Sequence, residues 1–81
     1  RRNKLIINIV QTDEAAKDID FLHKVIDILR NYPGQDEVSL AVVSGDEVTN
    51  LEIPQITVNY CKELVSELSH ILDESNIRLE P

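Results

Sequence analysis

The spacing of apolar residues switches between two periods along the chain, and the order of these switches constrains the fold more than any other feature. Alternation of apolar and polar side chains is typical of a half-buried strand, whereas steps of three and four residues are typical of an amphipathic helix. Alternation predicts strands at Lys4–Val10, Glu37–Val43, Val48–Ile53 and Ile77–Glu80. The longer steps predict helices at Asp18–Tyr32 and from near Asn59 to Leu72.

The two ends of the first helix are marked differently. Its start is ambiguous, because Thr12 or Asp13 can cap an early beginning and Asp18 can cap a later one. Its end is marked by Pro33, which disfavours helical geometry in the preceding residue, and by Gly34, which permits a turn. We therefore expect a Pro-Gly turn between the first helix and the second strand.

Turn-forming residues also separate the later elements. The run Ser44–Glu47 joins two alternating segments and predicts a hairpin around Gly45. Pro54 lacks an amide hydrogen for a strand ladder, so we expect the third strand to end there. Asn76 tolerates left-handed backbone geometry and is expected to turn the chain into the last strand.

The predicted order of elements is βαββαβ, which is typical of the split βαβ or ferredoxin-like sandwich. We expect an α+β protein of two layers, in which two helices cover one face of a four-stranded sheet. In this arrangement the first and third strands are central and both crossovers are right-handed. Eighty-one residues provide for one hydrophobic core, so residues 1–81 are predicted to form a single domain.

The sheet face without helices is a candidate protein-interaction face. Its outward positions, given the alternation, are Ile6, Asn8, Val10, Ser39, Ala41, Val43, Val48, Asn50 and Glu52, and five of these nine are apolar. A solvated sheet face is normally mostly polar, so we expect another domain, another protein or a second copy to cover this one. Scattered exposed aliphatic residues without significance are the alternative.

Seven of these positions form the candidate interaction face, namely Ile6, Asn8, Val10, Ala41, Val43, Val48 and Asn50. The last strand is a second candidate contact, through Ile77, Arg78 and Leu79. A homodimer through the open face is one of the arrangements that these surfaces allow.

Charge and composition argue against several functions. Fifteen acidic and eight basic residues give a net charge of −7, which repels phosphate backbones and disfavours direct nucleic-acid binding. Only Phe21, Tyr32 and Tyr60 are aromatic, which leaves little material for stacking on bases or ligands. No apolar run approaches the roughly 18 residues of a membrane span.

Residues with catalytic or metal-binding potential are few and scattered. His23 and His70 lie on different predicted helices, and neither has a ligand partner at metal-binding spacing. Gly34 and Gly45 stand alone, so no phosphate-binding loop is predicted. Cys61 has no cysteine partner, so the domain has no internal disulfide, which suggests either a reducing compartment or a parent protein that supplies extra stability. We expect a cytoplasmic location. We expect no catalytic residue, cofactor or metal site.

The chain begins with Arg1 and reaches an apolar segment within four residues, so we expect it to be excised from a longer protein. The runs LHKVIDILRNYPGQDEVSLAVV and LEIPQITVNYCKELVSELSHILDESNIRLEP resemble the extreme C-terminal domain of the bacterial DNA polymerase III alpha subunit. The resemblance covers Lys4–Pro81 and implies a role in DNA replication as a non-catalytic domain that docks onto the clamp-loader tau subunit. The parent would be a DNA-directed DNA polymerase, a nucleotidyltransferase whose active-site residues map to no position here.

A small-molecule regulatory domain of the ACT type is the alternative, because it shares the βαββαβ order. Such domains generally receive their ligand at a glycine-containing loop between the first strand and the first helix. The corresponding loop here, residues 11–14, is acidic and has no glycine, so it would receive an amino-acid carboxylate poorly.

Overall fold

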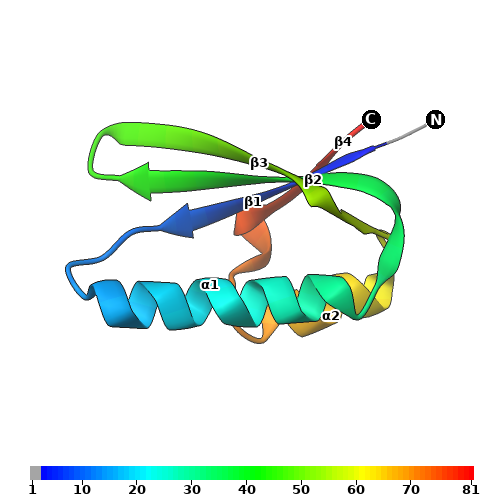
Figure 1. The fold of residues 1–81 in the computed structure, drawn as a ribbon, viewed down its shortest axis with the longest axis horizontal. Coiled ribbons are helices and arrows are strands. Elements are labelled where there is room, and N and C mark those ends of the chain that lie inside the picture. Colours follow the sequence, from blue (N-terminus) through cyan, green and yellow to red (C-terminus); the bar gives the residue numbers. More distant parts are fainter. Residues whose placement is uncertain (1–2) are drawn as a thin grey trace.

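A computed structural model describes residues 3–81 and confirms the element order βαββαβ. The elements are β1 (Lys4–Val10), α1 (Ala15–Arg30), β2 (Pro33–Ser44), β3 (Glu47–Val58), α2 (Lys62–Ser69), the 3-10 turn η1 (Glu74–Asn76) and β4 (Ile77–Glu80). Both helices lie on one face of the sheet, and no described element covers the other face (Figure 1). The predicted α+β, ferredoxin-like arrangement of two layers is confirmed.

The lateral order of the strands is β3-β2-β1-β4, with β1 and β2 parallel and the two outer pairs antiparallel. The prediction that the first and third strands are central was therefore wrong. The run Val38–Ala41 of β2 is small or apolar at every position and is buried on both faces, as in a central parallel strand. The run Glu47–Glu52 of β3 is exposed throughout, which suits an edge.

The core lies between the sheet and the helices. Leu5, Ile7 and Ile9 of β1 face the helices and pack against apolar residues of α1 and α2. The central helix residues are Val25 and Leu29 of α1 and Leu64, Leu68 and the following Leu72 of the α2 segment. Burial of each such side chain contributes roughly 1.5–3 kcal/mol, so the aliphatic stripe predicted from periodicity provides most of the stability.

Helix α1 begins at Ala15, close to the earlier of the two predicted starts, and Glu14 is the residue before it. Asp18 does not cap the helix but holds the preceding loop: its carboxylate accepts hydrogen bonds from the Thr12 N–H at 2.9 Å and the Thr12 hydroxyl at 2.7 Å. The Glu14 N–H donates to the Thr12 hydroxyl oxygen at 3.1 Å. The loop between β1 and α1 is thus fixed by its own side chains.

The predicted Pro-Gly turn was wrong by two residues. Helix α1 ends at Arg30, the chain turns at residues 31–32, and Pro33 is the first residue of β2. Gly34 is needed because β2 and β3 approach closely there: a Cβ on Gly34 would lie 2.6 Å from the Asn59 nitrogen and from the Val58 carbonyl atoms. The Asn59 N–H also donates to the Tyr32 carbonyl at 2.7 Å, which closes this end of the hairpin.

The predicted end of the third strand at Pro54 was also wrong, because β3 continues to Val58. Pro54 interrupts the ladder rather than the strand: Glu52 pairs with Ser39 and Thr57 with Glu37, so residues 53–56 face a single residue of β2. Helix α2 begins at Lys62, later than predicted. No residue other than glycine has a positive φ in the described chain, so Asn76 ends η1 without left-handed geometry.

Gly34→Ala should lower the free energy of unfolding by about 1–3 kcal/mol, the range for overpacking, because its methyl group would meet backbone atoms that cannot move independently. Urea unfolding followed by circular dichroism measures the change. Gly45→Asn is the control, because Gly45 has φ 60° and open space around it, and Asn tolerates that geometry. Equal stability of the two variants would contradict the close approach of β2 and β3.

Candidate interaction surface

Strand register places the open-face side chains in rows that run across the sheet. Val10, Val43 and Val48 are paired in this order across β1, β2 and β3, and they form the row nearest the hairpin turn, here called the valine row. Val10 is 62% exposed and Val48 58%, while Val43 between them is half-buried. Three of the predicted interaction residues therefore form one continuous apolar strip.

The next row consists of Asn8, Ala41 and Asn50, paired in the same way. Ala41 is buried, Asn8 is half-buried and Asn50 is exposed. Amide side chains thus flank a small central residue and border the valine row. Such an arrangement supplies hydrogen-bonding groups beside an apolar strip, as at the rim of a protein interface.

The other end of the open face is covered by an ion pair. The Lys4 ammonium of β1 lies 2.7 Å from a Glu52 carboxylate oxygen of β3, so the two side chains meet across β2. Beneath this end, Ile6 is only 8% exposed and Ser39 5%, although no described element covers them. Ile6, a predicted interaction residue, is therefore largely buried.

The same pair shifts the titration of both groups. The hydrogen bond to Glu52 raises the pKa of Lys4 above its ordinary value, and desolvation opposes this. The hydrogen bond from Lys4 lowers the pKa of Glu52, and the Ser39 hydroxyl adds to the effect. Both shifts favour the charged forms of the two groups.

The last strand contributes less exposed surface than predicted. Ile77 and Leu79 are half-buried and pack against the core. Arg78 points to the open face, is exposed, and lies 3.7 Å from a Glu80 carboxylate oxygen. Of the three predicted contact residues in β4, only Arg78 has a side chain available to a partner.

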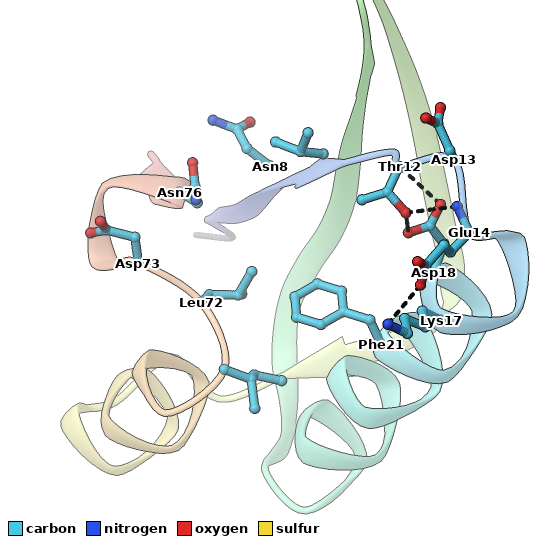
Figure 2. Close-up of a pocket in the computed structure, with 12 residues that line it drawn as sticks. Asn8, Thr12, Asp13, Glu14, Lys17, Asp18, Phe21, Leu72, Asp73 and Asn76 are labelled. Carbon is cyan, nitrogen blue, oxygen red and sulfur yellow. Dashed lines mark hydrogen bonds and ion pairs between the residues drawn. The ribbon is translucent and has the colours of Figure 1, made fainter.

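A hollow of about 700 Å³ lies beside the carboxyl end of β1. Its walls come from β1, the β1–α1 loop, α1 and the segment between α2 and β4, and Phe21 and Leu72 face each other across it (Figure 2). Asp13 and Asp73 lie on its rim, while Glu14 is paired with Lys17 at 2.7 Å. Periodicity did not reveal this hollow, because two segments far apart in the sequence, residues 8–21 and 71–76, form it. The shortness of the last predicted strand was the available signal.

Groups with metal-binding or nucleophilic potential remain apart. His23 and His70 are exposed on separate segments, and Cys61 is half-buried immediately before α2. Residues 3–81 contain no group of three or more His, Cys, Asp or Glu side chains that could hold a metal ion. Within the same residues, no helix combines the length and apolar character needed to cross a membrane.

Comparison with models of known protein families and with curated proteins found no match to this chain. The proposal of function therefore draws on the geometry and chemistry of the surface and on the sequence itself.

The Lys4–Glu52 pair should make stability depend on pH. Because the folded-state pKa of Glu52 is lowered, the contribution of Glu52 to stability is complete above its ordinary pKa of 4.5. This contribution is lost as the pH falls through the folded-state pKa. Because the folded-state pKa of Lys4 is raised, the contribution of Lys4 to stability is complete below its ordinary pKa of 10.5. This contribution is lost as the pH rises through the folded-state pKa. Glu52→Gln should therefore lower the urea midpoint at pH 7 and have little effect in acid.

Glu80→Gln is the matched control, since Glu80 is similarly exposed in a strand but lies 3.7 Å from its partner. We expect it to change the pH 7 midpoint less than Glu52→Gln does. A Glu52→Gln effect that persists unchanged at pH 3 would contradict the assigned pairing.

Proposed function

We propose that the chain is a non-catalytic protein-interaction domain of a bacterial replicative DNA polymerase III alpha subunit, and that it docks the polymerase onto the clamp-loader tau subunit. The valine row carries this proposal, because two of its three side chains are more than half exposed on a sheet face without a covering layer. The sequence resemblance over Lys4–Pro81 supplies the identity of the partner.

The chemistry of the open face supports protein binding at the hairpin end. Apolar side chains gain free energy when a partner removes them from water, by about 25 cal/mol for each Å² buried. The Asn8–Ala41–Asn50 row borders the valine row with amides, and the Lys4–Glu52 pair closes the far end. The surface therefore has an apolar centre and a polar border, the usual composition of a transient interface.

The run Tyr32-Pro33-Gly34, which belongs to the resembling segment, has a physical role in the fold. Pro33 opens β2, and Gly34 is the residue that lets β2 pass against the backbone of Val58 and Asn59. A glycine at this position is therefore required by the packing of the hairpin. A run that is demanded by the fold is expected in other chains that share the fold.

The negative charge is consistent with a protein partner near DNA. A net charge of −7 disfavours competition for the template strand. The same field accelerates encounter with a basic protein surface. Nucleotidyl transfer by the parent protein would use other domains, and we assign no residue of this chain to it.

An ACT-type regulatory domain is the alternative, and the hollow beside the β1–α1 loop is the observation that favours it. An amino-acid carboxylate would need free backbone N–H groups there. However, the Thr12 N–H already donates to Asp18 and the Glu14 N–H to Thr12. The rim also carries Asp13 and Asp73, which would repel a carboxylate, so this alternative has less support.

Val10→Asp and Val48→Asp should each weaken binding to the tau subunit by roughly tenfold or more, because each introduces a charge into the apolar contact of the valine row. Isothermal titration calorimetry against purified tau subunit measures the affinity. Val43→Asp should act in the same direction, although its half-buried position makes a folding check by circular dichroism necessary.

Ile19→Asp is the matched control, because Ile19 is 53% exposed on α1 and lies on the helical face. We expect tau binding to be unchanged by this substitution. Loss of binding with Ile19→Asp and not with the valine variants would place the contact on the helices and contradict the open-face proposal. Absence of binding by the unsubstituted chain would contradict the choice of tau as partner.

A thermal-shift screen against the common amino acids and nucleotides tests the alternative function. We expect the unfolding midpoint to stay unchanged with every compound. A genuine ligand at 100 times its Kd would stabilise the folded state by about 2.7 kcal/mol. In a domain of this size that would raise the midpoint by more than about 10 °C, and such a result would favour the regulatory domain.

A further inference from the structure

Strand β1 is longer than β4, the strand that pairs with one of its edges. Strand β4 pairs with β1 only from Lys4 to Ile7, where Ile77 is its first paired residue. Strand β1 continues to Val10, and on that side no strand among residues 3–81 pairs with Asn8–Val10. On the other side β2 remains paired as far as Val10. The last three residues of a central strand therefore have one open edge.

Backbone direction shows which groups this edge presents. The Gln11 N–H donates to the Val43 carbonyl at 2.8 Å, and the Asn3 carbonyl accepts from the Glu37 N–H at 2.9 Å. Odd-numbered residues of β1 thus point their backbone groups toward β2, and the alternating even-numbered residues point theirs to the opposite edge. The N–H and carbonyl of Val10 consequently face outward beside the hollow.

The turn η1 occupies the position where β4 would otherwise continue, but the Asn76 N–H bonds within the turn and not to β1. The Asn76 N–H donates to the Asp73 carbonyl at 2.9 Å rather than to β1. The Asp73 side chain accepts from the Ser75 N–H at 3.2 Å, which holds the turn in place. The segment before β4 is therefore fixed by internal hydrogen bonds and does not complete the β1 ladder.

The outer edges of the sheet carry features that oppose strand addition. In β3, Pro54 and the irregular register lie within residues 53–58, while the regularly paired run Glu47–Glu52 begins and ends with a charged residue. Strand β4 has only four residues, with charged Arg78 and Glu80. Prolines, irregularities, short length and charge are the usual means of blocking an edge. The open edge at Asn8–Val10 contains no proline and no charged residue, and it adjoins the 700 Å³ hollow.

The lining of the hollow indicates the chemistry of an occupant. Phe21 and Leu72 provide an apolar floor, and Asp13 and Asp73 provide negative charge at the rim (Figure 2). Lys17, the basic residue among the lining side chains, is paired with Glu14. An occupant with an extended backbone, apolar side chains and positive charge would match all of these features.

We propose that the open edge of β1 binds an extended peptide segment in which apolar residues alternate with Lys or Arg. The segment adds as a short strand beside Val10, past the position that η1 occupies, and bonds to the outward N–H and carbonyl of Val10. Because alternate side chains of a strand point to opposite faces, its apolar residues enter the hollow beside Phe21 and Leu72. This binding requires neither the tau subunit nor the polymerase assignment.

Fluorescence anisotropy with a labelled seven-residue peptide of alternating Lys and Val tests the proposal at low salt. Val10→Pro removes the outward N–H and should weaken binding about threefold to tenfold, while Val10→Ala keeps the N–H and should bind more tightly than Val10→Pro. Asp73→Asn keeps a side-chain acceptor for Ser75 but removes charge, and should weaken binding. Asp46→Asn, at the hairpin turn, is the control and should leave it unchanged.

The peptide itself provides a test that does not alter the protein. The same peptide with N-methylated backbone amides at alternate residues cannot form the ladder and should bind at least threefold more weakly. Equal binding of the methylated and unmodified peptides would show attraction by charge alone and overturn the proposal. Absence of binding by the Lys-Val peptide, or an equal effect of Asp46→Asn and Asp73→Asn, would also overturn it.

Discussion

The parallel pairing of β1 with β2 determines the rest of the structure. Two parallel strands cannot be joined by a short turn, so the intervening chain crosses the sheet as the 16-residue helix α1. With β1 and β2 adjacent at the centre, the hairpin strand β3 lies on one edge and β4 on the other. Helix α2 then packs beside α1, and the same face of β1 supplies Leu5, Ile7 and Ile9 to the core.

The unequal lengths of the strands give the domain two different ends. At one end β4 pairs with β1, and the Lys4–Glu52 pair crosses the open face above Ile6 and Ser39. At the other end the hairpin strands extend past β1 in Figure 1, and β4 has no residues. Apolar side chains and backbone groups therefore remain exposed at the hairpin end. The valine row and the open edge of β1 are consequences of the same mismatch in length.

Local patterns predicted the elements well, because periods of two and of three to four residues report directly on burial. They also predicted that Val10, Val43 and Val48 share a face. They did not predict the lateral order of strands, although the uninterrupted small and apolar run Val38–Ala41 indicates a central position. They also did not predict the low exposure of Ile6, nor the pair at the same end of the sheet between Lys4 and Glu52, which are 48 residues apart.

A surface with an exposed apolar row and an open strand edge could pair with a second copy of itself, yet charge opposes that outcome. Each copy has a net charge of −7, and the acidic residues Asp13, Asp46, Glu47 and Asp73 lie around the exposed end. Self-association would bring these like charges together, whereas a basic partner would neutralise them. Under the proposed function, the same apolar area would favour a different protein over a homodimer, and the preference should weaken as added salt screens the charges.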